Sequence, residues 1–414
     1  MINKNDHYDN TPLHIASREG HTDTVVVILT EGYEAIVDKK NEDEQSPCHL
    51  AAKYGHLEVL KLLIQKDPNA IFDKDEDDNT PLHLAATKKQ FETLDFLIQQ
   101  GASIQKRNDK SWTPLDCAAA SGAYKCAVLL LENDCPVDPF DRKKVTPLHL
   151  SAIHGHQKVA QLLLDHGASL SCENDEGKNA LELAIHHRNR DVAETIISSD
   201  RWRIALKSIN VSYNQRGEPI PDTPLRMLIR TFPDLAEDVF DKCIQHGSSN
   251  LEMDYEFLDD TFSLKQKETK SGKTKFYFEE LSDETIDAYD GCGTISMENH
   301  PLMLMVEEKQ KHLLRHPLCL GLLRKKWKRF GRYIFYSQFV FYVLFLISIT
   351  GYILNKLNTK TFPDEQNVYF ETESGISKDP TEHAFRIAVF ISVVLNMVIE
   401  ISQFIRVNYS KNFR

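Results

Sequence analysis

The sequence predicts a mainly α-helical protein, in which a solenoid of short helical repeats is followed by a mixed α/β linker and then by two transmembrane α-helices. Three observations support this prediction. A six-residue motif recurs through the first half of the chain, an aperiodic stretch follows, and the last part holds two long apolar segments. The net charge of −12 argues against nucleic acid as a partner, since phosphate binding needs a basic face.

The repeats occupy residues 1–199. The motif, Thr-Pro-Leu-His-x-Ala in its full form, returns every 33–35 residues. Five clear copies of the motif and a sixth, degenerate copy start at Thr11, Ser46, Thr80, Thr113, Thr146 and Asn179. Ankyrin repeats have this signature and a period of about 33 residues. We therefore predict an ankyrin-repeat solenoid of about six repeats, which has no active site of its own and binds cytoplasmic proteins on its concave face.

Two residue series inside the repeats resemble ligand sets. The motif histidines His14, His49, His83 and His149 are evenly spaced, but we expect each to satisfy backbone groups in its own repeat. The series from Asp73 to Asp77 imitates the start of a calcium loop but lacks the required glycine and glutamate. No C-x-x-C pair occurs among the eight cysteines, which fits reduced thiols in the cytosol.

Motifs of catalysis are missing from the sequence. It contains no G-x-S-x-G, no H-E-x-x-H and no glycine-rich phosphate loop. We therefore predict that the chain is not an enzyme and requires no cofactor.

The mixed linker is predicted to span residues 200–299. Short helices are expected at Leu225–Ile229 and Leu235–Ile244. The alternating segments 262–265 and 274–278 flank a Ser-Gly turn and predict a β-hairpin.

A pre-membrane segment is predicted at residues 300–332. It begins with one amphipathic helix that starts at His300 and is closed by Pro317. A run with six basic residues, Trp327 and Phe330 follows.

Two membrane spans are predicted after this run. Residues 333–354 carry no charge, and about 20 apolar residues are needed to cross the hydrocarbon core. A second apolar segment covers residues 384–405. Basic residues lie before the first span and after the second, which predicts cytoplasmic termini, an extracellular loop at 355–383 and a cytoplasmic end at 406–414.

The order of these parts resembles the N-terminal portion, through the second transmembrane helix, of the transient receptor potential ankyrin (TRPA) cation channels. Local segments that carry the resemblance are Ser199–Trp202, Phe240–Ile244, Met253–Phe257, Leu314–Cys319 and Glu400–Gln403. The resemblance implies a homotetrameric, calcium-permeable, nonselective cation channel of the plasma membrane that is gated by chemical or thermal stimuli in sensory transduction. The two spans would then begin a voltage-sensor-like helix bundle.

The resemblance also implies a sensor site in the linker. Members of the family sense electrophiles through linker cysteines, whose thiolates react. Cys243 corresponds to one of these cysteines and is the electrophile-sensing candidate; the alternative is a buried helix cysteine. Ala205, Glu218 and Leu235 stand where other sensor thiols are expected, so heat or another stimulus is as plausible as an electrophile.

A regulatory calcium site is implied on the second span. Glu400 and Gln403 match half of the family's cytoplasmic-side site, and their i, i+3 spacing places both oxygens on one helix face. The alternative is a polar face against neighbouring helices.

The sequence contains no selectivity filter, so we expect the chain alone not to conduct ions. The competing functional class is a membrane-anchored ankyrin scaffold or a regulatory short form.

Overall fold

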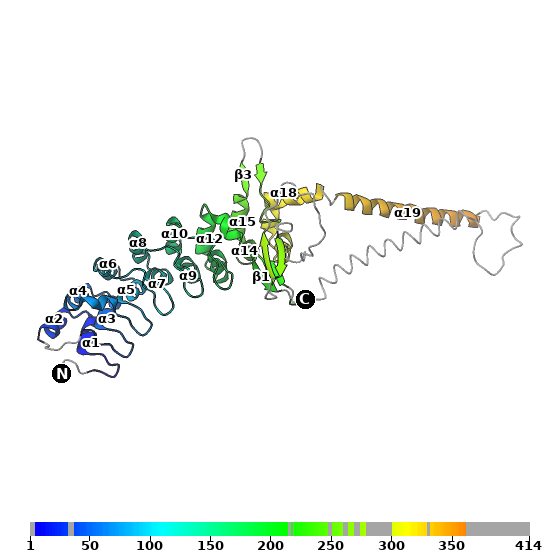
Figure 1. Ribbon diagram of the computed structural model, residues 1–414. Helices are drawn as coiled ribbons and strands as arrows, with labels where there is room; N and C mark the ends of the chain where they lie inside the picture. The colour runs from blue at the N-terminus through cyan, green and yellow to red at the C-terminus, as the bar shows by residue number, and fades with distance from the viewer. Residues whose placement is uncertain are drawn as a thin grey trace. The chain divides into compact units, whose positions relative to one another are not determined.

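The computed structural model of the chain describes residues 5–31, 37–213, 217, 219–246, 251–259, 264–268, 274–278, 300–328 and 332–361. The chain divides into two compact units, residues 1–319 and residues 320–414. Each unit is described by itself. Figure 1 shows the elements of both.

The first unit begins with a stack of helix pairs, in which the first helices form one row and the second helices another (Figure 1). The pairs are α1 (Pro12–Glu19) with α2 (Thr22–Glu31), α3 (Pro47–Tyr54) with α4 (Leu57–Lys66), α5 (Pro81–Thr87) with α6 (Phe91–Gln99), α7 (Pro114–Ser121) with α8 (Tyr124–Glu132), α9 (Pro147–His154) with α10 (Gln157–Asp165), and α11 (Ala180–His186) with α12 (Arg190–Ser198). A 3-10 turn, η1 (Pro68–Phe72), follows α4. The predicted helical solenoid is therefore confirmed.

Local sequence explains where these helices begin and end. Each first helix starts after a capping box in which the motif Thr, Ser or Asn and the residue three positions later bond each other's backbone N–H groups. Glycine then ends most of them; Gly122, for example, has a left-handed φ of 72°. A Cβ at Gly122 would lie 2.5 Å from Nδ1 of His156 in the next repeat, so this position also requires the absence of a side chain.

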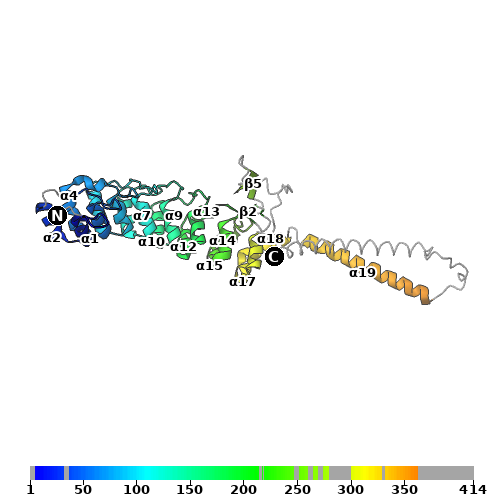
Figure 2. The same ribbon diagram turned by 90° about the horizontal axis from the view of Figure 1, so that it is seen from below.

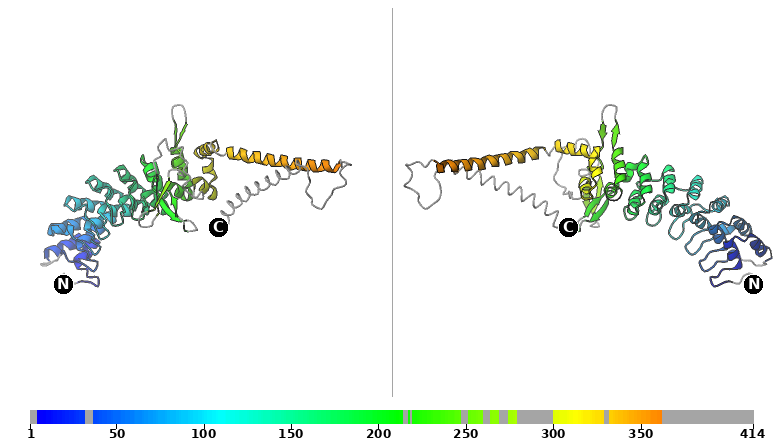
Figure 3. Two further views of the ribbon diagram at one scale, coloured as in Figure 1. Left: turned by 45° about the vertical axis from the view of Figure 1, so that its right-hand side comes forward. Right: turned by 180° about the vertical axis from the view of Figure 1, so that it is seen from behind.

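The core of the stack is a continuous apolar layer. Motif leucines and alanines of the first helices meet leucines of the second helices, and all are almost completely buried. Examples are Leu82, Ala85, Leu97, Leu130 and Leu163. Small alanines allow neighbouring first helices to approach closely. The loops between repeats project together from one side of the stack (Figure 3).

The linker continues this layer of helices. Helix α14 packs on α11, while α15 and then α17 follow α12 in a continuing row (Figure 2). The linker helices are α13 (Trp202–Leu206), α14 (Pro224–Thr231) and α15 (Pro233–Lys242). The two helices expected around 225–229 and 235–244 are therefore present.

In the part of the linker that the structure describes, three separate antiparallel pairs of strands accompany these helices, where the sequence predicted one hairpin. They are β1 (Asn210–Tyr213) with β2 (Pro219–Asp222), β3 (Ile244–His246) with β4 (Leu251–Met253), and β5 (Leu264–Glu268) with β6 (Thr274–Phe278). The third pair, in the register Leu264 opposite Phe278, is the hairpin that the alternation predicts.

The expected single helix from His300 to Pro317 is wrong. The structure has α16 (Pro301–Glu307), then α17 (Lys311–Arg315), then α18 (Pro317–Lys326). Lys309 adopts a left-handed φ of 57°, which breaks the first segment. Pro317 starts α18 and does not merely end its predecessor, because its fixed φ suits the first helical position.

The second unit contains α19 (Arg332–Thr361), a helix of 30 residues. Many of its large apolar side chains are exposed, including Tyr333, Phe335, Tyr336, Phe339 and Ile347. Among the residues that the structure describes, no helix is both long enough and apolar enough to cross a membrane. The expected second span, with Glu400 and Gln403, lies outside the described residues.

Candidate functional site

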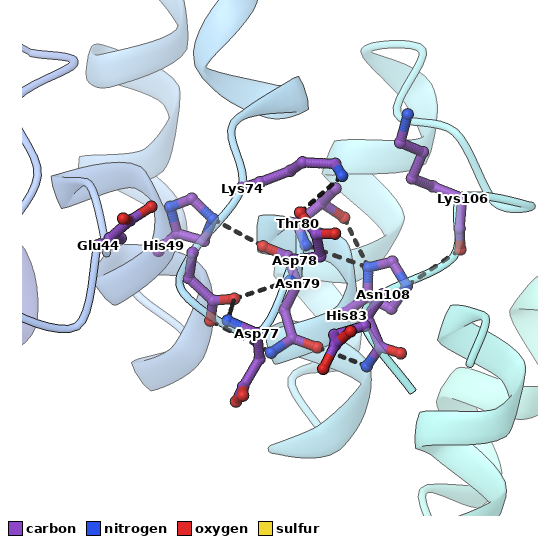
Figure 4. Close-up of polar contacts among 12 residues, drawn as sticks. Glu44, His49, Lys74, Asp77, Asp78, Asn79, Thr80, His83, Lys106 and Asn108 are labelled. Atoms are coloured by element: carbon purple, nitrogen blue, oxygen red, sulfur yellow. Dashed lines mark hydrogen bonds and ion pairs between the residues drawn. The ribbon is translucent and has the colours of Figure 1, made fainter. Parts of the chain in front are cut away.

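The motif histidines join each repeat to the next. In the third repeat, the backbone N–H of Thr80 donates to Nδ1 of His83 at 3.2 Å, so the ring proton is on Nε2. Nε2 in turn lies 3.0 Å from the carbonyl oxygen of Lys106 (Figure 4). It also lies 3.1 Å from the carbonyl oxygen of Trp112. Burial lowers the pKa of His83 to about 4, which keeps the imidazole neutral at pH 7.

Three other motif histidines make the same kind of contact. The carbonyl partners of His14, His49 and His149 belong to Gln45, Asn79 and Cys172, at 3.0–3.1 Å. The expectation that these histidines satisfy backbone groups is confirmed. It was wrong in one respect. Nε2 bonds a backbone carbonyl in the loop that leads into the following repeat, and only Nδ1 bonds the cap residue of the histidine's own repeat.

The projecting loops are also bonded to one another. Asp75 accepts the backbone N–H groups of Asp77 and Asn79 at 3.1 and 2.7 Å, so its oxygens close a turn. The side-chain amide of Asn108 donates to Oδ1 of Asn79 at 2.8 Å (Figure 4). The backbone N–H of Asp109 donates to the carbonyl of Asp77. These bonds connect the loops of consecutive repeats into one polar edge.

Acidic residues replace the histidine in two repeats. Oδ2 of Asp116 accepts the backbone N–H and the hydroxyl of Thr113, each at 2.8 Å. Oδ1 is buried, and none of the described residues donates to it. Burial raises the pKa of Asp116 to about 7, although the Thr113 bonds oppose the shift. Burial likewise raises the pKa of Glu182, whose Oε2 accepts Ser208, to about 7.

Cys243 lies at the C-terminal end of α15. Its backbone N–H donates to the carbonyl of Val239, its carbonyl accepts the N–H of Asp254 at 2.9 Å, and its side chain is 2 % exposed. Burial, followed by the charge of Asp254, raises the pKa of the Cys243 thiol to about 12; Arg203 has the opposite effect. The thiol is therefore protonated and shielded at neutral pH.

A cluster of aromatic and charged side chains surrounds this end of α15. Arg203 lies 2.6 Å from Asp254 and stacks 4.9 Å from the ring centre of Trp202. Lys242 donates to the carbonyl of Ile197 in α12 at 2.6 Å. These bonds join the last repeat, α13, α15 and the residue that follows β4. Of the other expected sensor positions, Ala205 and Leu235 are fully buried, and Glu218 lies outside the described residues.

Two His-Pro-Leu triplets attach the pre-membrane helices to the linker. Nδ1 of His316 accepts the N–H of Leu318 at 3.3 Å and so caps α18, while Nε2 lies 3.0 Å from Oδ1 of Asp241 on α15. His300 repeats this arrangement at α16, where Nδ1 accepts the N–H of Leu302 and Nε2 lies 3.4 Å from Asp259. Neither pair was predicted from the sequence, although the repeated triplet at 300–302 and 316–318 was visible there.

Comparison with known proteins identifies the repeats. The sequence profile described as ankyrin repeats (3 copies) matches residues 1–72, 69–141 and 135–206. Residues 1–206 are ankyrin repeats. The profile extends a little beyond the expected end at 199, to the last residue of α13.

Three curated relatives are transient receptor potential channels. The chain is 28% identical over 237 residues to the transient receptor potential cation channel subfamily A member 1 homolog of Caenorhabditis elegans, a match covering 51% of this chain and 19% of that protein. It is 32% identical over 142 residues to the channel protein painless of Drosophila melanogaster, covering 34% and 12%. It is 26% identical over 136 residues to subfamily A member 1 of the same fly, covering 32% and 11%.

These matches, together with the ankyrin repeats, cover the N-terminal half of the chain and confirm its resemblance to the N-terminal portion of a TRPA channel. The matched part spans less than a fifth of the length of each relative.

Because Cys243, beyond the ankyrin repeats, is buried, its thiol is predicted to react slowly with electrophiles. With N-ethylmaleimide at pH 7.5, we expect Cys172, which is partly exposed, to react at least about tenfold faster than Cys243, which is buried and protonated. Mass spectrometry of tryptic peptides at successive times measures both rates. In 6 M guanidinium chloride the two rates should become equal. Fast labelling of Cys243 in the native protein would contradict the burial described above.

The His316–Asp241 pair predicts a local effect on α18. We expect Asp241→Ala to raise hydrogen exchange in peptides covering 317–322 by about fivefold, because the imidazole loses the carboxylate that orients it at the helix cap. The matched control is Asp238→Ala, an exposed residue on the same helix with no bond to His316. Equal exchange in the two variants would show that the pair does not hold the cap.

Proposed function

We propose that this chain is the N-terminal part of a subunit of a calcium-permeable, nonselective cation channel gated by chemical or thermal stimuli. The observation that carries the proposal is the joint occurrence of ankyrin repeats and similarity to three transient receptor potential channels. Ankyrin repeats alone would not suffice, because they occur in proteins of many functions. The subunit would assemble as a homotetramer in the plasma membrane.

Membrane attachment is part of the proposal. Residues 333–354 contain no charged residue, and α19 exposes a series of large apolar side chains that water would not favour. The second span would follow at 384–405. We expect the full chain expressed in animal cells to stay in the membrane pellet at pH 11 in sodium carbonate, and a glycosylation sequon placed at 365–375 to be modified. Release of the chain by carbonate would refute the membrane assignment.

Channel function is tested by assembly. The chain would contribute to conduction only together with channel segments that supply a selectivity filter. Co-expressed with a TRPA channel subunit, it should co-purify and change the current that heat or an electrophile evokes. A matched form that ends at residue 319 would serve as the control, since it keeps the first unit, residues 1–319, but lacks most of α18 and all of α19. If neither form co-purifies with the subunit, the proposal fails.

Two regulatory sites belong to the same proposal. Electrophile sensing at Cys243 would require local opening of the α15 end, because the thiol is buried and protonated. A cytoplasmic-side calcium site would use Glu400 and Gln403 with oxygens from the rest of the channel subunit. In a complete channel that contains this segment, Cys243→Ser should abolish the electrophile response, and Glu400→Ala should weaken calcium modulation. Unchanged currents would remove the corresponding role.

A scaffold is the second candidate. Consecutive repeats expose the large side chains Tyr54, Phe91 and Tyr124, and aromatic side chains are enriched at protein interfaces. Cytoplasmic proteins would bind this surface. If the chain never changes channel currents but a Tyr54→Ala, Tyr124→Ala variant loses a defined binding partner, the scaffold function replaces the channel function.

A further inference from the structure

Helix α18 has one apolar face that is exposed. Leu320 and Leu323 of α18 and Trp327, the residue directly after its end, follow one another at intervals of three and four residues, which is the spacing of one helix face. They are 39%, 44% and 52% exposed. The other side of α18 is buried through Cys319 and Leu322. Exposed apolar side chains on one face of a short helix are unfavourable in water.

The charged residues of the sequence from 309 to 363 are all basic. Arg324, Lys325, Lys326 and Lys328 lie next to the residues of the apolar face in the sequence, and Arg332 begins α19. From 309 to 363 the sequence contains no aspartate or glutamate, although the chain as a whole holds 61 acidic residues against 49 lysines and arginines. The basic character of this stretch is therefore opposite to that of the rest of the protein.

An aromatic group links the apolar face to α19. The ring centres of Trp327 and Phe335 are 5.9 Å apart, and Phe335 contacts Tyr336 at 5.8 Å. The guanidinium of Arg332 lies over the ring of Tyr333 at 4.8 Å. Tryptophan and tyrosine beside arginine and lysine are characteristic of the zone where lipid headgroups meet acyl chains.

We infer that residues 320–328 and 332–336 form a docking surface for anionic phospholipids, on which α18 lies along the cytoplasmic face of the bilayer. Leu320, Leu323 and Trp327 enter the headgroup–acyl boundary, and the neighbouring lysines and arginines contact lipid phosphate and carboxylate groups. The arrangement is that of an interfacial amphipathic helix. Anionic lipid, not nucleic acid, fits this surface because its apolar face would have no counterpart on a phosphate backbone. The inference rests on the membrane attachment proposed above and names the lipid that the attachment selects.

The test measures which lipid contacts the protein. The full chain is reconstituted in vesicles of equal parts phosphatidylcholine and phosphatidylserine, with a trace of either lipid carrying a spin label. Electron spin resonance then gives the ratio of the two association constants. We expect phosphatidylserine to be preferred about fivefold at 0.1 M salt and much less at 1 M salt, since basic residues near an anionic surface are attracted to it and salt screens that attraction.

Matched variants locate the preference. A variant with glutamine at Arg324, Lys325, Lys326 and Lys328 should lower the ratio to about one. The control carries glutamine at four exposed lysines of the repeats, Lys66, Lys88, Lys125 and Lys158, and should keep the wild-type ratio. Brominated lipids should quench a fluorescence component that disappears in Trp327→Phe.

Three results would overturn the inference. A wild-type ratio near one in a protein that still resists carbonate extraction would reject the lipid surface and leave the proposed channel function intact. A preference that the glutamine variant retains would place the surface elsewhere. A single-stranded oligonucleotide that binds through the same four basic residues and displaces phosphatidylserine would show a nucleic-acid surface instead. Carbonate extraction of the wild type, by contrast, would reject the proposed function itself.

Discussion

Asp116→Asn should stabilise the protein at pH 8 by an amount of the order of 3 kcal/mol and should remove a pH dependence of the wild type. Burial raises the pKa of Asp116 from 3.8 to about 7, so ionising the folded protein at pH 8 places a charge in the interior. Asparagine has the same shape without the charge, and its carbonyl can still accept the N–H of Thr113.

The sign of the pH dependence follows from proton binding. Between pH 4 and pH 7 the folded protein keeps a proton on Asp116 that the unfolded chain releases. This contribution to stability is therefore complete below about pH 4 and is lost as the pH rises to about 7. Urea unfolding in detergent, monitored by circular dichroism at pH 5 and pH 8, measures it.

Two further variants serve as controls for Asp116. Asp165→Asn changes an exposed carboxylate of the next repeat and should leave the difference between pH 5 and pH 8 unchanged. Asp116→His should also stabilise the protein at pH 8, because it restores the residue that links the other repeats. If the two asparagine variants show the same difference in stability between pH 5 and pH 8, then ionisation of the buried Asp116 carboxyl does not lower the stability of the folded protein.

The helix starts of the solenoid could be predicted because their chemistry is local. Thr-Pro steps and αL glycines act within one turn, so a single copy of the motif contains the whole signal. The break at Lys309 could not be predicted, since lysine carries no preference for a left-handed backbone. Pro317 was ambiguous for a related reason: a proline disfavours the preceding helical residue and equally favours the start of the next helix.

The candidate site depended on contacts that one repeat does not contain. The sequence shows that aspartate replaces histidine at Asp116, but only the packed stack shows that Oδ1 is buried without a donor among the described residues. Likewise, the two His-Pro-Leu triplets are visible, but Asp241 lies 75 residues before His316 and Asp259 lies 41 residues before His300. Such pairings arise from tertiary structure and have no periodic signal.

His83→Ala should lower the free energy of unfolding by about 3 kcal/mol. The variant removes a fully buried ring, leaves the cap of Thr80 without its partner, and leaves the carbonyls of Lys106 and Trp112 without their donor. His187→Ala, at an exposed position on the stack, should change the stability by less than about 0.5 kcal/mol. Urea unfolding at pH 7.5 compares the two.

A third variant, His83→Asn, separates the two halves of this effect. Asparagine can accept the N–H of Thr80, as the carboxylates of Asp116 and Glu182 accept the cap N–H in their repeats, but it is too short to reach the next repeat. Its stability should therefore fall between those of the wild type and His83→Ala. A loss equal to that of alanine would assign the whole effect to the bond between repeats, whereas no loss would show that this bond is unimportant.

The pH dependence of His83 runs opposite to that of Asp116. Burial lowers the pKa of His83 from 6.5 to about 4, so the unfolded chain takes up a proton first as the pH falls. Its contribution is complete above about pH 6.5 and is lost as the pH falls toward 4. Acidification thus weakens repeats joined by histidine and strengthens the repeat that contains Asp116. In His83→Ala the stability should depend less on pH between 6.5 and 4; an unchanged slope would mean that the imidazole is not held neutral.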